Sequence, residues 1–175
     1  MLIDYLRLIL FAAALLAGVQ LPGFIDQYAK RVSAHQIEVA IDFRAFQETA
    51  DRYFGGSVEA LIAHHAASTD PPFRDEAVAI RTMYQRLLAL RAELAALRAP
   101  LIAQLLHVAL RPDREILAET RAAYSYTVPL NPSAIACGIA AGTLVALGIE
   151  ALFRGIWRLL RSATRSRVYV GESPR

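Results

Sequence analysis

Four histidines have the most obvious capacity for chemistry, because neutral imidazole binds metal ions and titrates near neutral pH. They lie at positions 35, 64, 65 and 107. His64 and His65 are adjacent, and consecutive helical side chains point about 100° apart, so both rings cannot easily face one ion. No acidic residue or histidine completes a metal motif with them. We expect solvated or structural histidines, with no metal and no other cofactor.

The sequence also shows no pattern of residues that is typical of nucleophilic catalysis. Cys137 is the single cysteine and lies in an apolar stretch. The sequence contains no nucleophile motif and no glycine-rich phosphate loop. We therefore predict that the protein is not an enzyme.

One acidic residue, Glu150, stands at the end of a long apolar stretch. Arg154 follows four residues later, as a neighbour on a helix. Arg7 is expected at the same depth if both apolar stretches of the chain cross a membrane. Ionisable groups at membrane depth are costly and are usually paired, so we expect an intramembrane ion pair or snorkelling side chains. The alternative is an ion relay, for which Gln20 and Thr143 are the further polar groups available.

Small residues recur at every fourth position of the same stretch, at Ala134, Gly138, Gly142 and Ala146. The first apolar stretch carries Ala14 and Gly18 at the same spacing. Small residues let helices approach closely in lipid. The stripe predicts either packing of two spans within one chain or homo-oligomerisation, and Gly142→Leu should weaken whichever contact exists.

Arginines recur at helical spacing after this stretch, at Arg154, Arg158, Arg161 and Arg165, with apolar residues between them. This pattern is typical of a basic amphipathic helix at a membrane surface, where anionic lipids attract it. A simpler interpretation is that the arginines only anchor the span. Nucleic-acid binding is not expected of a short tail next to a membrane.

The elements that position these residues follow from the distribution of apolar residues. The chain has 175 residues, of which 55% are hydrophobic, and a net charge of +3. Charged residues are absent from Leu8 to Ile25 and from Ala122 to Ile149. A span needs about 20 apolar residues, so we expect two transmembrane helices. A cleavable signal peptide is the alternative for the first, and a buried core helix for the second.

Charge predicts the orientation of the spans. Residues 154–175 carry six arginines and one glutamate, a net charge of +5, whereas residues 26–121 carry twelve basic and thirteen acidic residues, a net charge of −1. Basic flanks stay in the cytoplasm. Both termini are therefore predicted to be cytoplasmic and the middle periplasmic, although Lys30 and Arg31 argue against it. Aromatic residues that border the spans fit an interfacial belt: Tyr28, Tyr124, Tyr126 and Trp157.

The middle of the chain has helical periodicity. Apolar residues from Ile25 to Tyr53 recur mostly at gaps of three and four, and the glycines at 55 and 56 should end this helix. The helix can run on from the first span, with Pro22 and Gly23 as a bend. Ser57 should cap a short helix that ends at Ala67.

A second helical seam runs from Ile80 to Val108, after a start at Asp70 and the two prolines that follow it. Pro100 should kink or divide this helix. Asp113 should cap a last helix that ends near Tyr124. Two facing seams predict a helical hairpin, coiled coil or small bundle.

We therefore expect an all-α protein with two transmembrane helices joined by an extracytoplasmic helical hairpin or small bundle. The expected divisions are a first span at 1–25, a helical domain at 26–125, a second span at 130–153 and a basic cytoplasmic tail at 154–175.

Four sequence blocks are similar to a known family. They are GVQLPGFIDQY at 18–28, FQETADRYFGGS at 46–57, FRDE at 73–76 and YTVPLNP at 126–132. The chain resembles a family of small proteobacterial inner-membrane proteins of unknown function. The resemblance implies two spans but no activity, so it assigns no catalytic residue.

The expected function is that of an inner-membrane scaffold or interaction protein. Its expected partners are the bilayer and its anionic lipids, an unknown envelope protein and a second copy of the chain. The alternative is a small channel or transport accessory subunit, in which oligomerised spans place Gln20, Thr143 and Glu150 along a pore. An enzyme ranks third and an envelope stress sensor fourth, because the tail is too short for an output module.

Overall fold

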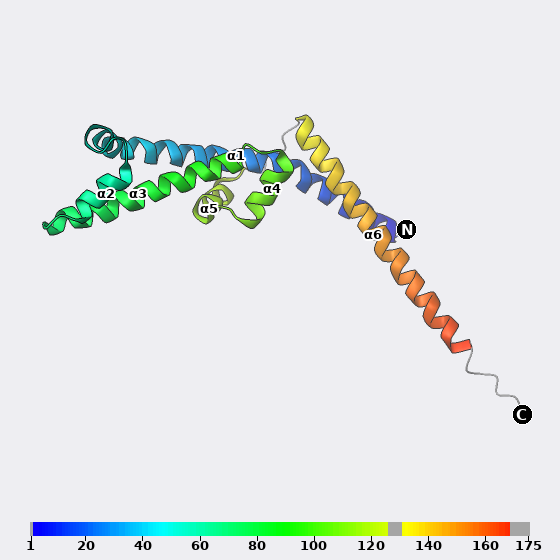
Figure 1. Cartoon of the computed structure of the whole chain (residues 1–175). Coiled ribbons are helices and arrows are strands. Elements are labelled where there is room, and N and C mark those ends of the chain that lie inside the picture. Colours follow the sequence, from blue (N-terminus) through cyan, green and yellow to red (C-terminus); the bar gives the residue numbers. More distant parts are fainter. Residues whose placement is uncertain (1, 126–130, 169–175) are drawn as a thin grey trace, which may run out of the picture. The chain divides into compact units, whose positions relative to one another are not determined.

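The computed structural model describes residues 2–125 and 131–168, with side chains for residues 4–125, 131–152, 154 and 155. These residues form helices and no strands. The helices are α1 (Leu2–Tyr53), α2 (Val58–Ala66), α3 (Pro71–Ala96), α4 (Leu101–Leu110), α5 (Arg114–Ala123) and α6 (Pro132–Val168) (Figure 1). The all-α prediction is confirmed.

The chain divides into two compact units. Met1–Gly23 and Tyr126–Arg175 form what we call the terminal unit, and Phe24–Ser125 forms the central unit. Helix α1 belongs to both, since it continues from Leu2 to Tyr53 with Pro22 inside it. The expectation that this helix runs on from the apolar stretch is therefore confirmed.

Glycines end α1 as the sequence predicts. Gly55 and Gly56 have φ angles of 58° and 87°, which residues with a Cβ atom rarely adopt. The Gly56 N–H donates to the Ala50 carbonyl at 3.0 Å and so satisfies a carbonyl at the helix end. The Ser57 hydroxyl then accepts from the Ala60 N–H at 3.1 Å and caps α2.

Pro100 divides the second seam into α3 and α4. Proline cannot donate a backbone hydrogen bond inside a helix, but its carbonyl accepts from the N–H groups of Ala103 and Gln104 at the start of α4. Asp113 caps α5 by accepting from the N–H groups of Glu115 and Ile116 at 3.1 and 3.2 Å. Both predicted boundaries are confirmed.

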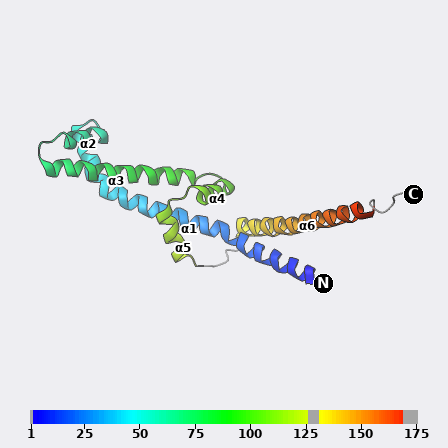
Figure 2. The ribbon, with the colours of Figure 1, turned by 90° about the horizontal axis from the view of Figure 1, so that it is seen from below.

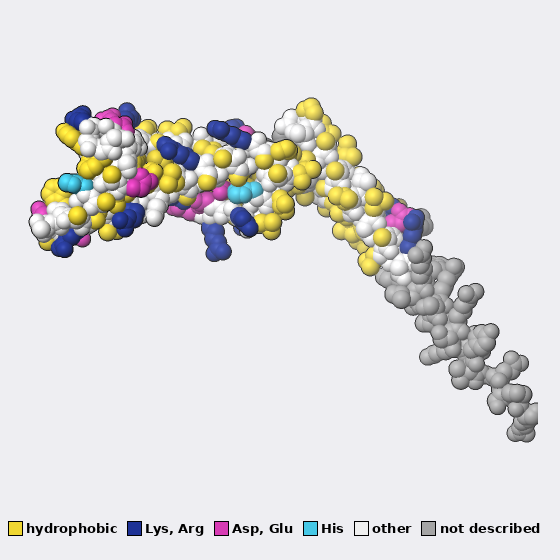
Figure 3. Space-filling view, in the orientation of Figure 1, with side chains coloured by type: hydrophobic (Ala, Val, Ile, Leu, Met, Phe, Trp, Pro, Cys, Tyr) yellow, Lys and Arg dark blue, Asp and Glu magenta, His cyan; other side chains and the backbone are white. Residues whose placement is uncertain are grey.

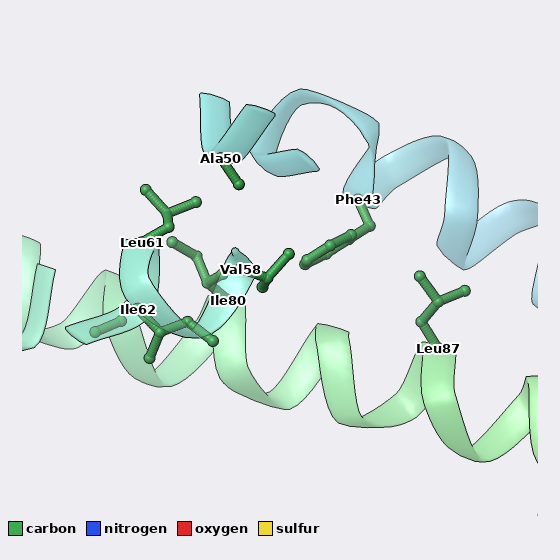
Figure 4. Close-up of a cluster of buried hydrophobic side chains, with 8 residues drawn as sticks. Phe43, Ala50, Val58, Leu61, Ile62, Ile80 and Leu87 are labelled. Atoms are coloured by element: carbon green, nitrogen blue, oxygen red, sulfur yellow. The ribbon is translucent and has the colours of Figure 1, made fainter. Parts of the chain in front are cut away.

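Two clusters of apolar side chains form the core of the central unit. The first, drawn in Figure 4, joins α1, α2 and α3, and its buried members are Phe43, Ala50, Val58, Leu61, Ile62, Ala77, Ile80 and Leu87. Helices α2 and α3 lie side by side in both views of the ribbon (Figures 1 and 2). The Phe43 ring also stacks on Tyr84 of α3, with 5.5 Å between the ring centroids.

The second cluster joins α1, α3, α4 and α5. Its buried members are Ile25, Tyr28, Val32, Leu90, Leu97, Val108 and Ile116. Residues from the middle of α1 thus pack with the late part of α3, whereas the first cluster pairs the late part of α1 with earlier residues of α3. The two helices therefore run in opposite directions, and α4 and α5 close over the end at which α1 enters the central unit.

Candidate functional site

Glycines let α1 and α6 come into close contact in the terminal unit. A Cβ atom on Gly138 would lie 2.4 Å from Val19 Cγ2 and 3.0 Å from the Leu15 carbonyl oxygen. A Cβ atom on Gly18 would lie 2.7 Å from the Cys137 carbonyl oxygen. Non-bonded carbon atoms normally stay about 3.5–4.0 Å apart, so both helices need glycine at this crossing.

The other members of the small-residue stripe lie in the same interface or next to it. A Cβ atom on Gly142 would lie 2.8 Å from Phe11 Cε2. Ala134 is buried, and Ala146 lines a surface hollow of about 240 Å³ together with Leu8 and Phe11. The stripe therefore packs largely against α1 of its own chain, which supports the intramolecular interpretation.

Three charged side chains meet at one end of this helix pair. Arg7 of α1 donates to Glu150 Oε2 of α6 at 3.3 Å, and Arg154 donates to Glu150 Oε1 at 2.5 Å. The structure thus brings together the three residues that the sequence analysis grouped. One carboxylate faces two guanidinium groups, so this group carries a net charge of +1.

Contacts along the helix pair show its direction. Arg7 meets Glu150, Phe11 meets Gly142, and Val19 meets Gly138. Residue numbers rise along α1 as they fall along α6, so the two helices are antiparallel. The first turns of α1 and the charged end of the α6 apolar stretch therefore lie together.

The outer surfaces of this helix pair are apolar. Large exposed side chains on the two helices include Leu6, Leu8, Ile9, Leu16, Ile139, Leu144, Leu147 and Leu152. Only 17% and 11% of the residues in the most apolar 18-residue stretches of α1 and α6 are buried, whereas a core helix of a soluble protein is mostly buried. Many hydrophobic side chains lie on the visible face of α6 before the charged group at which the described side chains end (Figure 3). By length and composition, both helices can cross a membrane.

The basic residues of the tail are only partly described. Arg154 is 72% exposed at its side chain. Arg158, Arg161 and Arg165 belong to α6, but their side chains lie outside the described residues, as does the side chain of Trp157. Tyr126 lies outside the described residues altogether.

A polar network lies inside the central unit, where the sequence analysis expects only apolar seams. Tyr28 of α1 is fully buried, so it does not belong to an interfacial belt. Its hydroxyl donates to Glu93 Oε1 at 2.6 Å and accepts from the Asp113 N–H at 2.9 Å. Burial and the hydrogen bond to Glu93 raise the pKa of Tyr28 well above its ordinary range. His107 Nε2 lies 3.0 Å from the same Glu93 oxygen, within ion-pair distance but without the geometry of a hydrogen bond.

Arginine and a second histidine extend this network to α5. Arg86 of α3 donates to the Asp113 carboxylate and, at 2.9 Å, to Glu115. On α1, His35 Nε2 lies 3.0 Å from Glu119 Oε2 within hydrogen-bond geometry, and the Arg31 guanidinium lies 3.6 Å from the same oxygen. These groups connect helices to one another, which supports a structural role.

The adjacent histidines lie apart from this network. They line a surface hollow of about 370 Å³ with Tyr53 and Phe54, and His65 Nδ1 lies 3.3 Å from Glu76 Oε2. No group of three or more potential ligands that could hold a metal ion occurs among the described residues.

A groove with mixed polarity runs between α2 and α3. It has a volume of about 360 Å³, and its lining includes Ile62, Leu88, Glu59, Arg81 and Tyr84. A hydrogen bond between Tyr84 and Glu59 raises the pKa of the tyrosine. The pKa of Glu59 is lowered, first by a hydrogen bond from its own backbone N–H and then by Tyr84. The groove thus presents a carboxylate beside apolar side chains.

The chain matches a known protein family over most of its length. Residues 2–162 match the family described as "Protein of unknown function (DUF2937)". The chain belongs to this family. No curated protein and no solved structure matches the chain. The resemblance to a family without an assigned activity is thereby confirmed, and the match covers every sequence block on which it was based.

Sequence reasoning missed the network of this family member because its partners are far apart in the chain. Tyr28 and Glu93 are 65 residues apart, and Tyr28 and Asp113 are 85 apart. One signal was available: Tyr28 occupies a position in the apolar seam, and a buried tyrosine hydroxyl usually needs a hydrogen-bond partner.

Proposed function

We propose that this chain is a bacterial inner-membrane protein with two spans, which presents its central unit on the periplasmic side as a non-enzymatic interaction scaffold. In this proposal α1 and α6 form the anchor. The helices of the central unit form a hairpin-based bundle that binds another envelope component. Both termini lie in the cytoplasm, where the arginines of the tail contact anionic lipids.

The proposed membrane topology rests on the antiparallel packing of α1 against α6. If both helices cross the bilayer, the contact between Arg7 and Glu150 puts the start of the first span and the end of the second at one membrane face. Arg154 and the tail behind it add positive charge to that face. Since basic flanks stay in the cytoplasm, that face is the cytoplasmic one and the central unit lies opposite.

The distribution of polar groups in the central unit supports a scaffold. The Tyr28 hydroxyl binds both Glu93 and the Asp113 N–H across helices, so these groups stabilise the fold. One surface of the central unit that is open to a partner is the groove between α2 and α3, where Leu88 is 44% exposed. A partner with an apolar side chain and a basic group would match Leu88 and the carboxylate of Glu59.

Reporter fusions test the topology. Alkaline phosphatase is active only outside the cytoplasm, so a fusion after Ser68 should be active and a fusion after Arg175 inactive. Activity only in the fusion after Arg175 would overturn the proposed orientation.

Site-specific photo-crosslinking tests the scaffold. A photoreactive amino acid at Leu88 should give a discrete adduct, whereas the same amino acid at Val78 should not, although Val78 is 61% exposed on the same helix. Equal patterns at both positions would contradict binding at the groove.

Ion conductance of liposomes that is lost in Glu150→Ala would instead favour the channel alternative.

A further inference from the structure

Helix α4 exposes an unusual apolar face. Ile102, Leu106 and Leu110 are 82%, 59% and 69% exposed, and their spacing of four places them on one side of the helix. The exposed Ala103 and Ala109 lie on the same side. An outward face made only of apolar side chains is expected to be covered by something other than water.

The polar residues of α4 are directed to the protein instead. Gln104 donates to the Ala99 carbonyl at 2.6 Å, and His107 lies beside Glu93 at 3.0 Å. On the inner side, Val108 is buried in the second cluster, with Leu101 and Leu105 packed against it. Helix α4 is thus apolar on both sides. With ten residues it is about 15 Å long, which is too short to cross a membrane.

The position of α4 along α1 indicates what kind of surface covers the exposed apolar face of α4. Helix α4 packs in one cluster with Ile25, Tyr28 and Val32. These residues follow Gly23, the last residue of α1 in the terminal unit, by two to nine positions (25 − 23 and 32 − 23). Along a continuous helix this is about 3–14 Å at 1.5 Å per residue. The chain itself therefore keeps α4 close to the end of the first apolar stretch.

The last part of the central unit lies at the same end as its first residues. Tyr124, which follows α5, packs edge-on against Phe24 with 5.3 Å between the ring centroids. The first residue of the central unit, Phe24, thus lies beside Tyr124 near the other end of its sequence, and α4 lies in the cluster against which Phe24 packs.

Charge at the ends of α4 matches a lipid surface. Arg98 precedes the helix, and Arg111 and Arg114 follow it. All three are exposed, and none forms an ion pair with another residue of the described chain. From 99 to 112 there is no acidic residue. Apolar residues flanked by arginine are typical of helices that lie in the headgroup region of anionic bilayers.

We propose that α4 is an interfacial helix, whose outer face of Ile102, Leu106 and Leu110 inserts into the bilayer surface next to the spans. Its arginines bind anionic headgroups. The occupant of this face is the lipid of the same membrane that the anchor crosses. The inference rests on the proposed membrane anchor, and it adds a second contact that fixes the central unit against the bilayer.

Depth-dependent fluorescence quenching tests this inference in the full chain. The protein with Trp157→Phe is reconstituted into phosphatidylethanolamine–phosphatidylglycerol vesicles, and one tryptophan is introduced at a time. Leu106→Trp should be quenched most strongly by lipids brominated near the headgroup. Val78→Trp should not be quenched, because Val78 is exposed on the early part of α3, which packs against the late part of α1.

A third position separates this inference from the proposed anchor. Leu144 is 69% exposed on α6, so Leu144→Trp should be quenched by lipids brominated deep in the chains. Quenching at Leu144 but not at Leu106 would overturn the interfacial helix and leave the anchor intact. Absence of quenching at both positions would overturn the anchor as well.

Two further outcomes identify the occupant. If a second copy covers the face, emission from Leu106→Trp should depend on the ratio of protein to lipid, and this would also overturn the proposal. Replacing Arg98, Arg111 and Arg114 by glutamine should reduce quenching at Leu106 in anionic vesicles and bring it to the level seen in phosphatidylcholine vesicles. Unchanged quenching would show that the arginines do not contribute.

Discussion

At the scale of single residues, Tyr28 is the side chain on which most of the central unit converges. Its hydroxyl joins α1 to Glu93 of α3 and to the backbone of Asp113 at the start of α5. We expect Tyr28→Phe to lower the free energy of unfolding by about 1–3 kcal/mol, because the partly buried Asp113 N–H and Glu93 carboxylate lose a partner. Denaturant unfolding of the protein in detergent measures this. Tyr53→Phe is the matched control, since Tyr53 is 69% exposed, and an equal effect in both variants would refute the role of Tyr28.

The raised pKa of Tyr28 predicts a pH dependence of the same measurement. Above the ordinary value of 10.0, the tyrosine of the unfolded chain loses its proton while the folded protein retains it. The unfolded state then binds fewer protons, so the free energy of unfolding falls as the pH rises. Tyr28→Phe lacks this effect, and its stability should approach that of the natural protein above pH 10.0. A difference that stays constant with pH would contradict the prediction.

Asp113 has two structural roles, and Asp70 has neither of them. Both are N-cap residues, but only Asp113 accepts cap hydrogen bonds through its side chain, and it also binds Arg86. Asp113→Ala should destabilise the protein by about 1–3 kcal/mol, because the cap is lost and Arg86 loses one of its two carboxylates. Asp70→Ala should cost clearly less, and thermal unfolding of both variants provides the comparison. Equal losses would show that the side-chain contacts of Asp113 add nothing.

At the scale of elements, the crossing of α1 and α6 depends on glycine. Gly138→Ala places a methyl group 2.4 Å from Val19 and 3.0 Å from a backbone oxygen, so the helices must move apart, at a cost of about 1–3 kcal/mol. Gly148→Ala is the control, since nothing lies within 4 Å of its added Cβ atom. In detergent, we expect Gly138→Ala to lower the melting temperature and Gly148→Ala to leave it unchanged. A loss of oligomers without a change in melting temperature would indicate that the stripe binds a second copy instead.

Boundaries of these elements could be predicted wherever the signal was local. Gly55 and Gly56 end α1 through their own φ angles, and Ser57 and Asp113 cap helices through atoms two or three residues away. The division at Pro100 follows from its missing N–H. The buried polar network is different in kind, because it exists only after α1, α3, α4 and α5 have packed. Leu90 and Leu97 of the second seam are buried in the core, so substitutions there would unfold the central unit rather than remove a partner.

At the scale of the whole molecule, the packing of α1 predicts that the first apolar stretch stays attached. A cleaved signal peptide leaves the mature protein, but here the stretch supplies Gly18 and Val19 to the contact with α6 and Arg7 to the contact with Glu150. It also continues without interruption into the helix that carries Ile25 and Tyr28 of the central unit. A chain that carries one epitope tag at each end should therefore keep both tags in the membrane fraction. As a control, the same N-terminal tag on a protein with a cleavable signal peptide should be lost. Removal of the N-terminal tag together with the first apolar stretch would show that α6 is retained without its partner helix, and would refute the anchor as a helix pair.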